Sequence, residues 1–230
     1  MSERPYHHGN LREALLAAAV ELIAEAGPAG FTLREAARRA GVSHNAPYRH
    51  FRDKDELVAA VAAQGFDELT QAMSKAAAKR KTTLDRLESS GLAYVGYALD
   101  RPQHFTVMFD TALSDAAELA RVSGARAFET LVGFIVECQQ DGKLPPGDPI
   151  ELARVAWSLV HGIAKLAVAG RFPGWSRSQV LDFARLATDR LLRGLAAPLT
   201  GSSIRPAARA RRRLRATPRS LRRPPAAGPT

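Results

Sequence analysis

The stretch Thr32-Leu33-Arg34-Glu35-Ala36-Ala37-Arg38-Arg39-Ala40-Gly41-Val42-Ser43-His44-Asn45-Ala46-Pro47-Tyr48-Arg49-His50-Phe51 places two short helical patterns on either side of a glycine. Ala36 and Ala37 are small enough for two helices to approach closely, and Gly41 can take the positive φ of a tight turn. Val42 and Phe51 are suited to anchoring the unit in a core. The stretch therefore predicts a helix-turn-helix whose second helix begins at Ser43.

The exposed face of this second helix is predicted to carry short polar or flat side chains. They are Ser43, His44, Asn45, Pro47 and Tyr48. In a helix-turn-helix the second helix enters the major groove of DNA, with its N-terminal residues at the base edges. The alternative is an ordinary pair of amphipathic helices, which would carry acids and lysines on this face. Residues 43–52 contain no acid, so DNA binding is favoured.

The helices around this motif are indicated by their start and stop signals. Three starts pair a polar N-cap with Glu three positions later, at Asn10 and Glu13, Thr32 and Glu35, and Asp53 and Glu56. The expected helices run from Leu11 to the stop at Gly27 and Pro28, from Leu33 to Ala40, from Ser43, and from Lys54 to about Lys79. The last of these would be roughly 39 Å long at 1.5 Å per residue.

The rest of the chain is also helical in pattern, so the predicted fold class is all-α. Periodic stretches run over residues 84–99, 102–109, 116–140, 150–169 and 177–195, and Pro, Gly and Asp separate them. We expect a DNA-binding domain at residues 1–53, a larger helical domain for effector binding and dimerisation at 54–195, and a disordered tail rich in Arg, Pro and Ala at 196–230.

The net charge of +10 is concentrated at the C-terminal end of the chain. Residues 195–230 hold nine arginines and no acid, whereas the preceding residues are almost neutral. The tail could add nonspecific affinity for DNA or be inert. A basic RNA-binding or nucleoid protein is a further class, and only this tail favours it.

Membrane and enzyme classes find little support in the sequence. The longest apolar stretch, residues 159–168, is far shorter than the roughly 20 residues of a membrane-spanning helix. The N-terminus lacks an apolar signal region, and the single Cys138 fits a reducing compartment, so the cytoplasm is expected. No catalytic constellation, phosphate-binding glycine loop or metal site is evident, and no cofactor is expected. Glu21 and Glu25 fit a solvated helix face.

The residues from Thr32 to Leu57 resemble the tetracycline-repressor (TetR) family of transcription regulators. The resemblance is most specific at Tyr48-Arg49-His50-Phe51 and at the following Asp53-Lys54-Asp55-Glu56-Leu57. Tyr6-His7-His8-Gly9-Asn10-Leu11-Arg12, and Trp157 with His161-Gly162, resemble a subgroup named for its Trp-His-Gly signature. The resemblance implies a repressor released from a palindromic operator by a small molecule.

The resemblance also implies roles for single residues. Thr32, Tyr48, His50 and Lys54 would contact phosphates, while Ser43, His44, Asn45 and Pro47 would lie nearest the bases. Arg34 is a further candidate for DNA contact. Many family members have Ala-Leu-Tyr where this chain has Ala46-Pro47-Tyr48. Because proline removes an N–H from the first turn of the helix, it can change the path of that turn.

Aromatic residues in the later helices are the candidates for an effector pocket. They are Tyr94, Tyr97, Phe105, Met108, Phe109, Phe128, Phe134, Trp157 and His161. For each of them, a place in the ordinary core is the favoured interpretation. The helix expected at 150–169 is apolar nearly all round and must be covered on two sides. A second subunit, packed on this helix and the one at 177–195, is the simplest cover and predicts a homodimer; an entirely intramolecular helix is the alternative.

Overall fold

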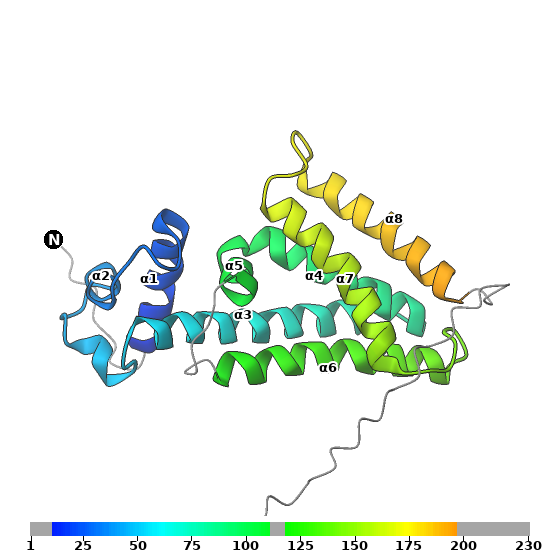
Figure 1. Ribbon diagram of the computed structural model, residues 1–230, viewed down its shortest axis with the longest axis horizontal. Coiled ribbons are helices and arrows are strands. Elements are labelled where there is room, and N and C mark those ends of the chain that lie inside the picture. The colour runs from blue at the N-terminus through cyan, green and yellow to red at the C-terminus, as the bar shows by residue number, and fades with distance from the viewer. Residues whose placement is uncertain (1–10, 111–117, 197–230) are drawn as a thin grey trace, which may run out of the picture. The chain divides into compact units, whose positions relative to one another are not determined.

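The computed structural model describes residues 11–110 and 118–196, and these residues contain helices and no strand (Figure 1). The predicted all-α class is confirmed. The elements are α1 (Leu11–Ala26), α2 (Leu33–Arg39), the 3-10 helix η1 (Ala46–Arg49), α3 (Lys54–Ala77), α4 (Thr83–Asp100), α5 (Pro102–Asp110), α6 (Glu118–Gln140), α7 (Pro149–Val168) and α8 (Arg177–Ala196). The predicted cap Asn10 and the tail from residue 197 onward lie outside the described residues.

Local signals determine where these helices begin and end. At the start of α2 the Thr32 hydroxyl accepts a hydrogen bond from the Glu35 N–H, and the Glu35 carboxylate accepts one from the Thr32 N–H at 2.8 Å. At the start of α3 only half of the predicted reciprocal pair forms. Asp53 accepts from the Glu56 N–H, but the Glu56 carboxylate accepts from the N–H of Arg52 and not from that of Asp53.

Helix α3 runs along the molecule and packs against most of the other helices (Figure 1). Its first half is buried on every side, from Leu57 through Ala63, because α1, α5 and α6 all pack against it. Its second half keeps one buried face, with Leu69 and Met73 directed into the core. Helices α4 and α6 pack against α3, and α7 and α8 pack in turn on α4, so one continuous helix belongs to the core at both ends.

All of the described helices belong to one compact unit. The division at residues 53 and 54 expected from the sequence stays a prediction. No helix among residues 11–110 and 118–196 is long and apolar enough to span a membrane.

The turn between α2 and η1 depends on a left-handed glycine. Gly41 has a φ of 71°, and the Val42 N–H donates to the Ala37 carbonyl at 3.0 Å across the turn. A Cβ added at Gly41 would meet no atom within 4 Å, so a larger residue would strain only the backbone.

Gly41→Ala is therefore expected to lower the free energy of unfolding by about 1–2 kcal/mol, the cost of the left-handed conformation for an L residue. The matched control is Gly133→Ala in the exposed interior of α6, where a Cβ also meets nothing. There the higher helix propensity of alanine should stabilise by up to about 1 kcal/mol. Urea unfolding of both variants checks the opposite signs, and equal effects would contradict the argument.

Candidate DNA interface and internal cavity

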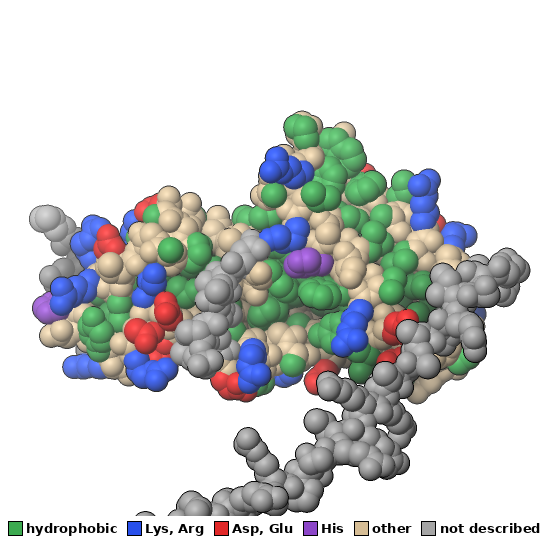
Figure 2. Space-filling model, viewed as in Figure 1, with side chains coloured by type: hydrophobic (Ala, Val, Ile, Leu, Met, Phe, Trp, Pro, Cys, Tyr) green, Lys and Arg blue, Asp and Glu red, His purple; other side chains and the backbone are tan. Residues whose placement is uncertain are grey.

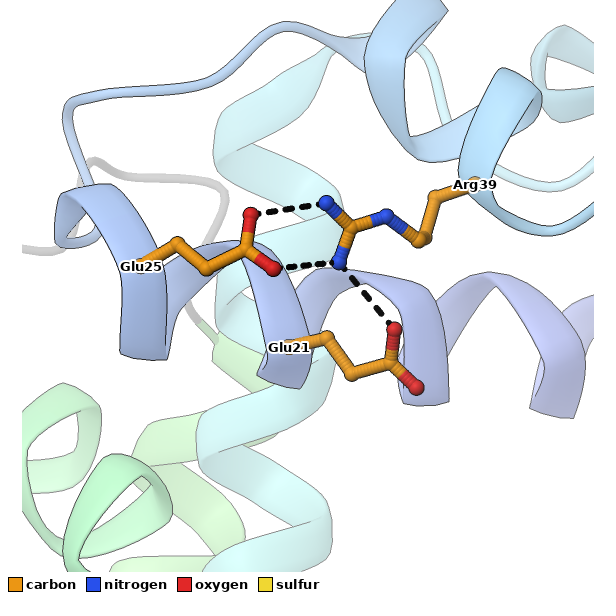
Figure 3. Close-up of polar contacts among 3 residues, drawn as sticks. All are labelled: Glu21, Glu25 and Arg39. Atoms are coloured by element: carbon orange, nitrogen blue, oxygen red, sulfur yellow. Dashed lines mark hydrogen bonds and ion pairs between the residues drawn. The ribbon is translucent and has the colours of Figure 1, made fainter.

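The helix-turn-helix unit is held together by a buried core and by one arginine on its surface. Ala36 and Ala37 are fully buried against α1, as their small size predicts. Figure 3 shows Arg39, from the end of α2, between Glu21 and Glu25 of α1. Its guanidinium donates to both Glu25 oxygens at 2.7 and 2.8 Å and to Glu21 at 3.2 Å.

Glu21 and Glu25 are exposed to 61% and 57%, as expected of a solvated helix face, and both also pair with Arg39. The hydrogen bonds from Arg39 hold the pKa of the Glu25 carboxyl below its usual range. Both acids thus connect α1 to α2 through exposed ion pairs, which add modestly to the packing of the buried core. The signal available in sequence was the i,i+4 spacing of the acids on α1, but it did not reveal the partner, which lies 14 residues further along the chain.

The second helix of the motif is shorter than predicted. A helix from Ser43 was expected, whereas the structure has only the 3-10 helix Ala46–Arg49, with Asn45 as its N-cap. Pro47 lies at its beginning and is fully buried, so the prediction that Pro47 is exposed near the bases is wrong. The pyrrolidine ring lacks an N–H and packs into the core, which leaves the polar residues on either side to form the surface.

The other residues proposed for DNA contact lie on the outside of this unit. Ser43, His44, Asn45, Tyr48 and His50 are exposed around η1, and Arg34 is exposed on α2. The sequence analysis did not single out Arg49, which is exposed on the same 3-10 helix. Its positive charge within the predicted recognition helix could have indicated it as a residue that contacts DNA.

Two residues proposed for phosphate contact have partners within the protein. The Thr32 hydroxyl serves the cap of α2 and also donates to Glu35 at 2.9 Å. Lys54 Nζ donates to the Ala29 carbonyl at 3.3 Å and lies 5.9 Å from the centre of the Phe31 ring. Lys54 is therefore held in place at the start of α3, beside the loop that precedes α2.

An internal cavity of about 370 Å³ lies between α3, α4, α5, α6, α7 and α8. Tyr94, Phe109, Phe128 and Trp157 are among the residues that line it, together with aliphatic side chains such as Leu69. The Trp157 ring N–H donates to the Tyr94 hydroxyl at 3.2 Å, and this hydroxyl lies 2.8 Å from His161 Nδ1. Burial raises the pKa of the Tyr94 hydroxyl, which therefore keeps its proton.

Five of the proposed pocket residues do not line this cavity, and one of them, Phe134, is buried in α6 beneath the Arg86 guanidinium. His161 lies behind Tyr94 and Phe109, with 4.6 Å between the His161 and Phe109 ring centres. Phe105 is fully buried beside them. Met108 is buried next to Gly65 of α3. Tyr97 faces a separate open hollow between α3, α4 and α8, where its hydroxyl donates to Glu68 at 3.4 Å.

Two polar groups of the lining were not expected from the sequence. Arg154 and Thr188 belong to the lining, on α7 and α8. Arg154 precedes Trp157 by three positions, and this spacing places the two residues on one helix face. The spacing could therefore have indicated that Arg154 lines the same cavity as Trp157. Thr188 has no such signal in a helix of mixed composition. Among the described residues, no cluster of three His, Cys, Asp or Glu side chains is placed to hold a metal.

Comparison with known proteins agrees with this architecture at both ends of the chain. Residues 15–61 match the family described as "Bacterial regulatory proteins, tetR family", and residues 87–191 match "Tetracyclin repressor-like, C-terminal domain". The chain belongs to the TetR family. It is thus a DNA-binding transcription regulator of the helix-turn-helix type, as the family resemblance implied, and not an enzyme.

Individual TetR-family relatives differ in how much of the chain they match. A protein with unknown function from Rhodococcus sp. RHA1 is 37% identical, covers 85% of this chain with all of its own, and superposes with a TM-score of 0.75. PfmR, a TetR family transcriptional regulator from Thermus thermophilus, is 22% identical and superposes with a TM-score of 0.64. The match covers 79% of this chain and 98% of PfmR, and at this identity it shows the fold alone.

The curated relatives match over a short segment. The HTH-type transcriptional repressor Rv3405c of Mycobacterium tuberculosis is 50% identical over 48 residues, which are 21% of this chain and 26% of that protein. The match therefore spans about a quarter of the curated relative.

The joint between α3 and α5 contains a buried imidazole. His104 of α5 lies beside Gly65 of α3, and neither ring nitrogen has a hydrogen-bond partner among the described residues. Burial lowers the pKa of His104, an effect that Arg101 strengthens and Glu68 opposes. The folded protein therefore holds this imidazole neutral.

Because the unfolded chain takes up a proton near pH 6.5 and the folded chain does so only at lower pH, stability should fall as the pH drops below 6.5. His104→Leu removes this proton uptake. The variant is expected to lose less stability than the wild-type protein between pH 7.5 and pH 5.5, measured by urea unfolding, with both pH values chosen to bracket the ordinary histidine pKa of about 6.5. Parallel losses in the two proteins would contradict the assignment.

Proposed function

We propose that this protein is a homodimeric repressor that leaves a palindromic operator when a small molecule fills the internal cavity. The observation that carries the proposal is the exposed surface around η1, where Ser43, His44, Asn45, Tyr48 and Arg49 stand together without an acid among them. Such a surface can approach the negatively charged backbone and offer short polar groups to base edges. A protein with this role would act in the cytoplasm, on the bacterial chromosome.

Helix α3 supplies a route from the cavity to the DNA surface. Phe66, Leu69 and Met73 of α3 line the cavity, while the beginning of the same helix packs under α1. An effector that prefers a cavity shape with a different tilt of α3 would change the separation of the two DNA-reading units of a dimer. Operator affinity would fall as a result. The naming of one relative as a repressor favours repression over activation.

A dimer is supported by an apolar surface on α7 and α8. Hydrophobic side chains gather over these two helices on the face shown in Figure 2. Val155 and Leu166 of α7 and Phe183 and Leu186 of α8 are exposed, although both helices also have a buried face. Large exposed apolar patches are typical of subunit interfaces. The alternative of a helix at 150–169 with nothing exposed does not fit these side chains.

The operator binding of two variants can distinguish residues that contact bases from residues that contact the DNA backbone. Asn45→Ala should relax the preference at one base pair of each half-site, where a base contact contributes about 1–3 kcal/mol of discrimination. Lys54→Gln should weaken the binding of all DNA sequences alike. It should also lower the slope of log affinity against log salt concentration by about one for each lost phosphate contact. Lys81→Gln, an exposed lysine that follows α3, is the control and should change neither quantity.

Selection of bound sequences from random duplexes, repeated with each variant, provides the measurement. The assigned roles are wrong if Asn45→Ala keeps the wild-type consensus while Lys54→Gln alters it. Because Lys54 also contacts Ala29 and Phe31, its variant is compared at a temperature well below its own melting transition.

Leu186→Glu is expected to convert the dimer to a monomer at micromolar concentration, because a carboxylate would have to be buried in an apolar interface. Leu119→Glu on α6 is the matched control, since Leu119 and Leu186 are exposed to 50% and 47%. Sedimentation velocity distinguishes the two. A monomeric wild-type protein, with and without DNA, would overturn the proposed dimer.

A further inference from the structure

We infer that the cavity accepts an elongated apolar carboxylate whose anionic end lies toward Arg154 of α7 and Thr188 of α8. This inference rests on the proposed function only in treating the cavity as the effector site. The described lining is almost entirely apolar. The cavity volume of about 370 Å³ suits a small molecule. The few polar groups of the lining therefore decide which end of a ligand goes where.

Thr188 is the first of these groups. Its side chain is 5% exposed, and the hydroxyl oxygen is buried without a hydrogen-bond partner among the described residues. Other hydroxyls on helices of this protein donate to the carbonyl four residues earlier, as Thr70 does to Phe66 and Thr130 does to Arg126. Thr188 does not use that option, although it costs free energy to leave a buried hydroxyl unpaired. A ligand oxygen in the cavity would supply the missing acceptor.

Arg154 is the second group. It is the one cation in the described lining, which contains no aspartate or glutamate. Arginines on neighbouring helices pair with acids, for example Arg86 with Glu137 at 2.8 Å and Arg177 with Asp100 at 2.7 Å. Arg154 takes part in none of the ion pairs among the described residues, so its charge is available to an anion. At the edge of an apolar cavity the attraction is screened less than in open water.

The other polar side chains of the lining already have partners within the protein. The Tyr94 hydroxyl accepts the Trp157 N–H and lies at hydrogen-bond distance from His161. The Ser90 hydroxyl donates to the Leu87 carbonyl at 2.7 Å. Aromatic rings also belong to the lining, with Phe66 and Phe109 edge to face at 5.4 Å. The apolar part of a ligand fits among these rings, and its carboxylate fits Arg154 and Thr188, the two polar groups of the lining that lack a partner among the described residues.

The test compares two probes that share a chain and differ in the end group, decanoate and decanol. Isothermal titration of the full-length dimer with each probe gives the dissociation constants. Decanoate is expected to bind about tenfold more tightly than decanol, since a charge-assisted hydrogen bond is roughly twice as strong as a neutral one. Arg154→Gln should remove this difference by weakening decanoate alone, and Arg154→Lys should keep most of it.

Arg190→Gln is the matched control, because Arg190 is an exposed arginine of α8 outside the lining. Thr188→Val tests the second group with a readout that a merely structural residue would not give. Valine fills the same space without a hydroxyl, so the unliganded variant should melt at a higher temperature than the wild-type protein while binding decanoate several-fold more weakly.

Three results would overturn the inference: equal affinity for the two probes, a preference for decanoate that survives Arg154→Gln, or a lower melting temperature in Thr188→Val. Gel-shift assays with a selected operator keep this inference separate from the proposed function. If decanol releases the operator as well as decanoate does, effector control stands and the ligand class is wrong. If decanoate binds as expected but no duplex is selected, the proposed function fails and the ligand class stands.

Discussion

The burial of α3 is the constraint on which the rest of the structure depends. Seven consecutive residues, Leu57 to Ala63, are buried, and a helix can bury every face only when other helices surround it. α1 provides one cover, and α5 and α6 provide others. The DNA-reading unit therefore shares a core with the cavity-bearing helices, and neither can change its packing on α3 without effect on the other.

Small residues make this close packing possible. Gly65 lies so near Met108 that a Cβ there would approach its sulfur to 2.6 Å, and Gly124 of α6 lies against the Phe66 ring. Helix α3, which contains Gly65, also contributes Phe66 and Leu69 to the cavity wall. A ligand that moves these side chains acts directly on the helix whose first turn follows the helix-turn-helix. His104 adds a buried imidazole without a partner at this joint, where the packing is tight but the polar groups are not all satisfied.

Electrostatics act differently at the two functional surfaces. At the DNA-reading unit, Arg39 is occupied by Glu21 and Glu25, and Lys54 by the Ala29 carbonyl, so charged side chains there orient the scaffold. The surface around η1 presents short polar groups together with the exposed Arg49. At the cavity wall, Tyr94, Trp157 and His161 satisfy one another, whereas Arg154 and Thr188 have no such partners among the described residues. Specificity for a ligand then depends on the unsatisfied groups, because only these gain interactions when it binds.

Sequence patterns are enough to predict the α-helices and the family, but not the shortening of the recognition helix to η1. Local rules are enough for the Thr32 and Glu35 cap, the left-handed Gly41 and the interruptions at proline and glycine, since each acts within a few residues. The folded structure was needed to show that Pro47 is buried, that Arg39 reaches α1, and that Arg154 and Thr188 line the cavity while His161 does not. These outcomes depend on how helices distant in sequence pack together, and a side chain's periodicity indicates the face it occupies without revealing what that face meets.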